Sequence, residues 1–398
     1  MKKIYYLIFS IYLVISIYFL KKEISLEYEW IFIMKDFAKY GWEYRLYGMY
    51  SAYMPPFYSY FLLISSKVFG SNWLTVVCCI QGLTVFFSLF SFFKVLFEEK
   101  RFSVVIVLAF CSILFFPPIL IGVYKISSFA FSLSVMLLFF TILYKISKSK
   151  IVYNKQWGIL AILSIVGLYL RYEFIFIISL SIFAFYINKR ISVKKMILLG
   201  AMALMAYFPW CLRNYYMIGK FAYSTSYNFN FAKGYNEKYD PYITFNNPYS
   251  PQLKKIVTNK MLSEMFTNEK DMDEYLGNLN HDFIMNNPKL FIKLTATKFL
   301  INFTQYFPGY EGINRYKIYI FYSWYMMAVQ VLLILSLRKI YLTNKRSFLL
   351  YMTGGLYLFF LFFYIIAPLP RYILLFYPIF IAVILKTYYR KNINSINK

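Results

Sequence analysis

Long apolar runs recur along this chain, and they constrain its fold more than any other feature. A membrane hydrocarbon core is ~30 Å thick, so a helix needs roughly 20 apolar residues to cross it. Eight runs approach that length: 4–20, 73–96, 102–121, 127–145, 196–212, 318–337, 347–366 and 372–387. A ninth stretch, 156–188, is too long for one crossing and is interrupted by charged residues near 171, which predicts two short helices meeting at a charged turn. The sequence therefore predicts an all-α polytopic membrane protein with about ten transmembrane helices.

The composition supports a membrane protein over a soluble one. Of the 398 residues, 60% are apolar and only 15% are charged, which is unusual for a soluble domain of this size. The net charge of +26 would suit nucleic-acid binding, but the basic residues form short clusters between the apolar runs, where cytoplasmic loops carry them. We therefore expect no nucleic-acid partner. The four cysteines all fall within apolar segments, so the sequence predicts neither a disulfide nor a zinc site.

The basic clusters also predict the orientation of the chain. When the chain starts in the cytoplasm and crosses ten times, every cluster falls on the cytoplasmic side, as the positive-inside rule requires. Both termini are then cytoplasmic in a plasma membrane, and heavy use of Lys, Ile, Asn, Tyr and Phe suggests a bacterium of low GC content. We expect a single membrane domain, residues 1–398, with two extracytoplasmic loops. The first, about 21–72, should hold amphipathic helices, and the second, about 213–317, should be larger and mixed in structure.

Acidic residues of the first loop are the first candidates for chemistry. Glu27, Glu29 and Asp36 follow the first apolar run, and in a helix Glu29 and Asp36 would share a face. A carboxylate held there could act as a general base toward an acceptor or could ligate a divalent cation. An ordinary solvated loop would contain the same residues, and residue type alone favours that simpler interpretation.

Arginines at the outer ends of the apolar runs are candidates for binding an anion. In the charged turn, Arg171 and Glu173 either pair with each other or leave Arg171 facing an anionic head group, and the residues alone do not separate these alternatives. Arg213 and Arg371, which precedes Tyr372, border the second loop where the positive-inside rule does not call for arginine. A phosphate is the kind of ligand that two arginines would hold.

Several known classes of site find little support in the sequence. His281 is the sole histidine, so a Ser/His/Asp triad or a histidine-rich metal site is not expected. We also find no glycine-rich phosphate loop, so neither ATP-driven transport nor nicotinamide chemistry is indicated.

Three short segments are similar to those of a known family. Residues 208–215 (Phe-Pro-Trp-Cys-Leu-Arg-Asn-Tyr) end the apolar run before the second loop, residues 55–58 (Pro-Pro-Phe-Tyr) lie in the first loop, and residues 370–372 (Pro-Arg-Tyr) follow the second. With these segments in the order 55–58, 208–215 and 370–372 along its length, the chain resembles the polyprenyl-phosphate-dependent glycosyltransferases of the GT-C class. This class includes the protein mannosyltransferases and the aminoarabinose transferases.

The resemblance implies a sugar donor linked to a polyprenyl phosphate and a glycan, lipid or protein acceptor at the outer face. Where the family commonly has an aspartate, this chain has Leu26, so Glu27 or Glu29 would serve as the catalytic base. The residues that would bind substrate are Asp36, Arg171, Glu173, Arg213, Arg371 and Tyr372. The transfer would invert the sugar centre, and although no cofactor is required, a divalent metal ion remains an open alternative.

Two other functions compete with this one. A surface-polysaccharide polymerase or ligase has a similar number of spans and a large outer loop, but it tends not to depend on a first-loop carboxylate. A flippase for lipid-linked oligosaccharide usually shows repeated halves and polar residues spread through many helices. Because the charge here is concentrated at loop borders, the sequence favours a membrane glycosyltransferase of cell-envelope synthesis.

Overall fold

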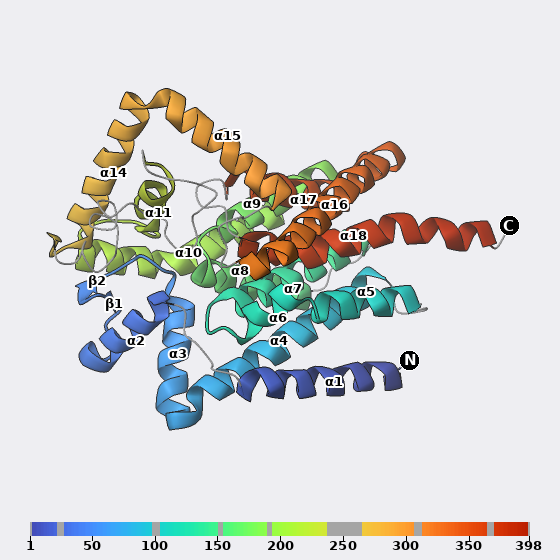
Figure 1. Cartoon of the computed structure of the whole chain (residues 1–398), viewed down its shortest axis with the longest axis horizontal. Coiled ribbons are helices and arrows are strands. Elements are labelled where there is room, and N and C mark those ends of the chain that lie inside the picture. Colours follow the sequence, from blue (N-terminus) through green and yellow to red (C-terminus); the bar gives the residue numbers. More distant parts are fainter. Residues whose placement is uncertain are drawn as a thin grey trace.

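The protein is a bundle of apolar helices with a cap of shorter elements at one end (Figure 1). The computed structural model describes residues 2–21, 28–97, 104–149, 154–188, 193–236, 265–305, 313–363 and 370–396. The bundle helices are α1 (Lys2–Lys21), α4 (Trp73–Leu96), α5 (Val104–Leu114), α6 (Pro117–Tyr124), α7 (Phe129–Lys148), α8 (Asn154–Leu170), α9 (Phe174–Asn188), α10 (Val193–Ile218), α16 (Ile313–Thr343), α17 (Phe348–Phe363) and α18 (Pro370–Ile396).

The cap is built from the two predicted loops. The first contributes α2 (Tyr28–Tyr40), β1 (Arg45–Leu46), β2 (Met49–Tyr50), α3 (Pro56–Phe69) and the 3₁₀ turn η1 (Gly70–Asn72). The second contributes α11 (Ser226–Gly234), α14 (Glu269–Asn286) and α15 (Pro288–Thr304). We call this side of the bundle the loop end. The opposite side, where α1 begins and α18 finishes, is the terminal end (Figure 1).

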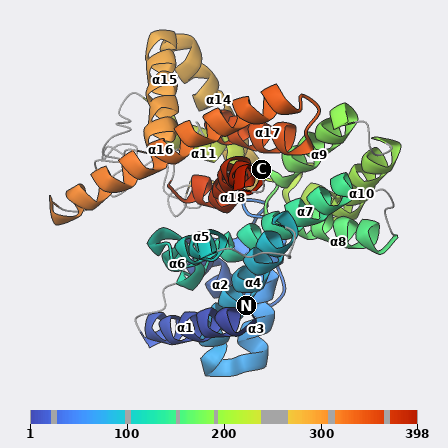
Figure 2. The same ribbon diagram turned by 90° about the vertical axis from the view of Figure 1, so that its right-hand side faces the viewer.

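The helix α18 organises the bundle. It packs against α4, α5, α6 and α7 on one side and against α16 and α17 on the other, and Figure 2 shows it near the centre of the molecule. At the terminal end, the Lys386 ammonium of α18 donates a hydrogen bond to the carbonyl oxygen of Leu96 in α4. Segments distant in the sequence are thereby fixed around one central helix.

Membrane-spanning length is reached by only some of the helices. Within the described residues, four helical segments are long and apolar enough to cross a membrane, and the bent pair α5 and α6 makes a fifth if it counts as one span. The four are Pro56–Leu96, Phe129–Lys148, Lys194–Ile218 and Ile320–Thr343. Four other apolar helices, including Phe174–Asn188 and Phe348–Phe363, are shorter. The apolar runs are helical as predicted, but ten complete crossings and the cytoplasmic placement of the termini stay predictions.

One apolar run departs from the single straight helix expected of it, and one predicted break is found. The run 102–121, predicted as one helix, bends by 48° between α5 and α6. Pro117 begins α6 and Pro118 follows it, and because a proline lacks the N–H that continues a helix, the axis breaks there. The predicted break in 156–188 is found between Leu170 and Phe174, so that prediction is confirmed.

A small β-hairpin lies in the first loop, for which only amphipathic helices were predicted. Arg45 pairs with Tyr50 and Leu46 with Met49 in antiparallel register. The two residues between the strands, Tyr47 and Gly48, both have positive φ (55° and 82°), as a tight hairpin turn requires. Strands of two residues leave no alternating pattern long enough to detect in a sequence, which is why the prediction missed them.

Candidate functional site at the loop end

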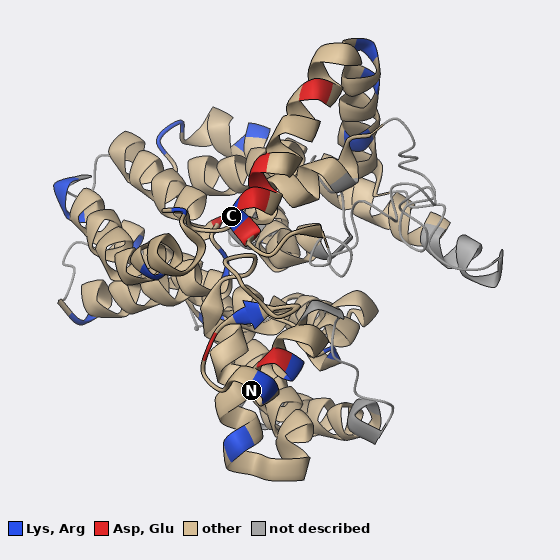
Figure 3. Cartoon of the chain, turned by 90° about the vertical axis from the view of Figure 1, so that its left-hand side faces the viewer, with Lys and Arg blue, Asp and Glu red and all other residues tan. Residues whose placement is uncertain are grey.

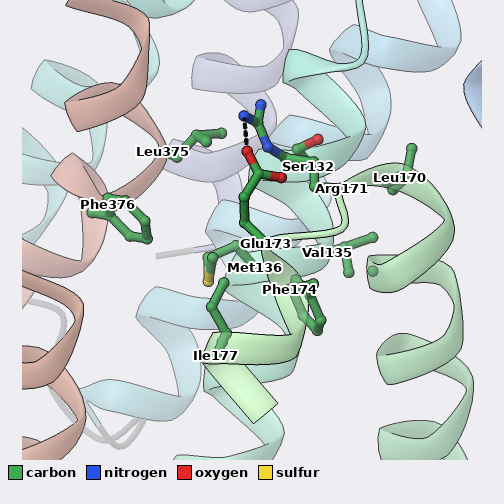
Figure 4. Close-up of a pocket in the computed structure, with 11 residues that line it drawn as sticks. Ser132, Val135, Met136, Leu170, Arg171, Glu173, Phe174, Ile177, Leu375 and Phe376 are labelled. Atoms are coloured by element: carbon green, nitrogen blue, oxygen red, sulfur yellow. Dashed lines mark hydrogen bonds and ion pairs between the residues drawn. The ribbon is translucent and has the colours of Figure 1, made fainter. Parts of the chain in front are cut away.

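The α8–α9 turn carries a partly buried ion pair. Arg171 Nη2 lies 3.0 Å from Glu173 Oε1 (Figure 4), and the Glu173 side chain is only 9% exposed. A carboxylate this far from water is strongly destabilised unless a cation pairs with it. Of the two alternatives that the sequence left open, pairing therefore occurs. The Arg171 side chain remains 20% exposed.

A narrow cavity runs from this ion pair into the bundle. Figure 4 shows Ser132, Val135, Met136, Leu170 and Phe174 around it, together with side chains of α18. The walls are mainly apolar, and the charged pair lies on one side. A volume of about 20 Å³ is room for a single water, so a larger ligand must displace side chains or lie at the mouth.

The start of α18 lies beside the same turn. The Arg171 guanidinium carbon is 5.6 Å from the centre of the Tyr372 ring, within the range of a cation–π contact. Arg371 precedes Tyr372 in the first turn of α18, although its side chain lies outside the described part of the chain. Arg171 and Glu173, chosen from one sequence argument, and Tyr372, chosen from another, are thus neighbours.

Arg213 binds the first loop to the end of α10. Its Nη1 donates to the carbonyl oxygen of Ser51 (2.7 Å) and to Asn214 Oδ1 (3.0 Å), and its Nη2 donates to the carbonyl oxygen of Tyr44 (2.7 Å). The guanidinium also lies over the Trp210 ring, 4.9 Å from its centre. Because three of its donors already have protein acceptors, this geometry favours a positioning role, and phosphate binding by Arg213 stays a prediction.

A buried carboxylate that the sequence analysis did not single out lies next to Arg213. Glu269, at the start of α14, is 2% exposed. Its oxygens accept hydrogen bonds from Ala52 N (2.8 Å), Ser51 Oγ (3.3 Å) and the Thr225 hydroxyl. Burial raises the pKa of Glu269 to about 7, although these donors oppose the shift. The Asn268 cap, whose Oδ1 accepts from Lys270 N at 2.8 Å, and the acidic first turn mark this helix start in the sequence. Neither signal says anything about burial.

Hydrogen bonds connect the Glu269 cluster to the charged turn. Ser226, next to Thr225, donates from its hydroxyl to the Tyr172 hydroxyl at 2.9 Å. Four segments distant in sequence therefore meet at the loop end: the first loop, the α8–α9 turn, the end of α10 and the second loop. We call this set the loop-end junction; it consists of Ser51, Ala52, Tyr172, Arg213, Thr225, Ser226 and Glu269.

The first-loop carboxylates play different parts. Asp36 Oδ2 accepts a hydrogen bond from Gly48 N at 2.9 Å, so it holds the hairpin turn, and burial raises its pKa. Glu29 lies in the first turn of α2, but its side chain is outside the described part, and Glu27 lies outside it altogether. The next residue, Trp30, is buried with its ring 4.8 Å from that of Tyr58. The catalytic assignment to Glu27 or Glu29 therefore stays a prediction.

Acidic groups at the loop end are spread out rather than gathered on one point. Figure 3 shows acidic residues along α14, where Asp273 pairs with the Lys220 ammonium. In the part of the chain that the structure describes, no three His, Cys, Asp or Glu side chains come together as a metal-binding group. Glu173, Glu269 and Asp273 have hydrogen-bond or ion-pair partners in the protein.

Comparisons with known proteins give one structural likeness. No family model matches the chain, and no curated protein matches it in sequence. Among solved structures, the chain is similar to ArnT from Cupriavidus metallidurans bound to undecaprenyl phosphate. The identity is 11%, the TM-score is 0.45, and the likeness covers 94% of this chain and 77% of that one. A likeness of this size does not establish a shared function.

Proposed function

We propose that this protein is a membrane glycosyltransferase that moves a sugar from a polyprenyl-phosphate donor to an acceptor at the loop end. The observation that carries the proposal is the meeting of Arg171, Glu173 and Tyr372 under two loops that hold most of the carboxylates of the chain. A partly exposed arginine side chain beside an apolar cavity suits a phosphate attached to an apolar chain. The short segments that resemble the GT-C class support the same reaction.

The reaction needs two groups that this end can supply. An acceptor hydroxyl or amine attacks the anomeric carbon, its proton passes to a carboxylate, and the bond from that carbon to the phosphate oxygen breaks. The electron pair leaves on the phosphate, where cationic donors stabilise it. Glu27 or Glu29 would take the proton, and Arg171 and Arg371 would hold the phosphate beside Tyr372. A single displacement of this kind inverts the sugar centre.

Other predicted residues would act by holding this arrangement. Glu173 orients Arg171, and Arg213 and Asp36 fix the shape and position of the first loop. The loop end would face the outside of the bacterial plasma membrane, in the synthesis of a cell-envelope glycan or glycolipid. The terminal end would then face the cytoplasm, as its basic clusters indicate.

Transfer of labelled sugar tests the proposal directly. Membranes containing wild type, Glu27→Gln, Glu29→Gln or Arg371→Ala at matched expression are given a panel of polyprenyl-phosphate sugar donors. We expect transfer by wild type, and its loss in Arg371→Ala and in one of the two glutamine variants. Equal background in all four membranes, with leaflet exchange of a lipid-linked oligosaccharide that requires the protein, would replace the transferase by a flippase.

A further inference from the structure

A second, more polar cavity lies at the terminal end of the bundle, far from the loop-end junction. Its volume is about 220 Å³, against about 20 Å³ for the cavity beside Arg171. That space is below the ~300–1,000 Å³ typical of drug-sized ligands, but it is ample for a small head group. Three segments form it: the end of α7, the end of α9 and the turn between α16 and α17. The polar side chains that line it are Tyr144, Ser147, Lys148, Asn188, Arg346 and Ser347.

Asn188, which lines this cavity, has a buried acceptor atom. Its Nδ2 donates to the carbonyl oxygen of Arg346 at 2.7 Å, which fixes the orientation of the amide. Its Oδ1 is buried and has no hydrogen-bond partner among the described residues. A buried acceptor that gave up water and gained no donor is costly, so such atoms call for an explanation. A ligand that carries a hydroxyl or ammonium group would supply the missing donor.

Two cations stand at the same opening. Lys148 ends α7, Arg346 precedes α17, and both residues are exposed. No carboxylate among the described residues forms an ion pair with Arg346. Two positive charges around a polar cavity favour a phosphate, and Arg346 can contact one with two parallel donors.

The position of the cavity identifies the source of that phosphate. Phe348 and Leu349, at the start of the apolar helix α17, also line it, so polar and apolar walls meet there. A phospholipid has the same order of groups, with a phosphate and a polar head above apolar chains. We propose that this cavity binds the head group of a membrane phospholipid: Lys148 and Arg346 contact the phosphate, and Asn188 Oδ1 accepts a hydrogen bond from the head-group hydroxyl or ammonium.

Lipid binding to the purified full-length protein tests this site. Native mass spectrometry with added phosphatidylglycerol or phosphatidylethanolamine compares wild type with Lys148→Gln/Arg346→Gln. The matched control is Lys194→Gln/Lys195→Gln, which removes the same charge from exposed residues at the same end of the bundle. We expect the first variant to bind lipid about tenfold more weakly or worse, because each basic residue near a phosphate contributes to the attraction. The control should bind like wild type.

Further arms separate the lipid from a soluble phosphate and test the buried amide. Asn188→Leu should weaken binding of both lipids, because it removes the acceptor of the head-group hydrogen bond, and its melting temperature reports whether the fold survives the loss of the amide. Inorganic phosphate at millimolar concentration should not displace the lipid. Equal lipid binding by wild type and by the Lys148/Arg346 variant would overturn the proposal. Displacement of the lipid by inorganic phosphate alone would also overturn it and would indicate a site for a soluble phosphate.

Discussion

The two ends of the bundle use charge in opposite ways. At the loop end, Glu173 and Glu269 are buried and bonded to protein partners, and fourteen of the seventeen carboxylates of the chain lie in the two loops. At the terminal end, basic residues such as Lys194 and Lys345 are exposed. Membrane topology explains Lys194 and Lys345, which do not line the terminal-end cavity, without any ligand, because the positive-inside rule places basic residues there. It does not explain buried charges, which are costly unless they position other groups or take part in function.

The largest expected effect is at Arg171. We expect Arg171→Ala to lower sugar transfer by ~100-fold or more, as when one preorganised donor is removed from a reacting oxygen. The variant also leaves Glu173 without its cation, so Arg171→Ala/Glu173→Ala is the partner that separates the two causes: it should regain stability but not activity. Lys194→Ala, at the terminal end, serves as the control. Sugar transfer by Arg171→Ala at the wild-type rate would mean that buried charge at the loop end matters no more for the reaction than exposed charge at the terminal end.

The packing of the α8–α9 hairpin offers a second way to disturb the ion pair. A Cβ added at Gly167 would lie 2.4 Å from Cδ1 of Phe174, the residue that follows Glu173. We expect Gly167→Ala to cost ~1–3 kcal/mol through overpacking and to reduce transfer by shifting the turn. Gly158, in the same helix, has nothing within 4 Å of an added Cβ, so Gly158→Ala is the matched control. Thermal melting and transfer rates check both, and equal behaviour would contradict the tight packing seen here.

The pH dependence of stability tests whether the pKa of Glu269 is raised in the folded protein. Its pKa of about 7 lies above the ordinary value of 4.5, so between these pH values the folded protein keeps a proton that the unfolded chain releases. The stabilisation is therefore complete below about pH 4.5 and is lost as the pH rises toward about 7. Melting temperatures from pH 5 to 8 should fall less steeply for Glu269→Gln than for wild type. Glu274→Gln, exposed on the same helix, should keep the wild-type slope.

A smaller effect is expected at Asp36, where two roles can be separated. Asp36→Ala removes the acceptor of the Gly48 amide and should loosen the hairpin by ~1 kcal/mol, visible as faster proteolysis at the turn. Asp36→Asn keeps an acceptor oxygen there. If Asp36 only holds the turn, Asn restores both the hairpin and transfer. Restored resistance to proteolysis without restored transfer would favour contact with substrate.

The smallest effect should come from exposed basic residues at the terminal end. Lys194→Gln/Lys195→Gln removes two charges that topology alone explains, so transfer in detergent should stay within about twofold of wild type, as expected for surface substitutions away from special features. Transfer rates at matched protein concentration provide the measurement. A marked loss would mean that this end contributes to the reaction.

Local features of the site were predictable where a rule of membrane chemistry applied. Charged residues inside an apolar stretch are rare enough that the sequence placed the α8–α9 turn correctly and singled out both partners of its ion pair. The position of Arg213 at an outer helix end was equally conspicuous, yet its carbonyl partners in Tyr44 and Ser51 were not. Burial of Glu269 also could not be foreseen, because a helix start in a polar loop looks the same whether or not another loop covers it.

The sequence by itself determined the membrane class, the helical runs and the residues at which two of them break. These properties follow from local apolarity and from proline and charge, which act within one or two turns of the chain. Only the tertiary structure decided which loops, turns and helix ends meet. Ser226 reaches Tyr172, Glu269 reaches Ala52, and Asn188 reaches the carbonyl of Arg346, because helix packing brings these partners, 54 to 217 residues apart, within hydrogen-bonding distance. Such contacts depend on the arrangement of helices and not on local sequence.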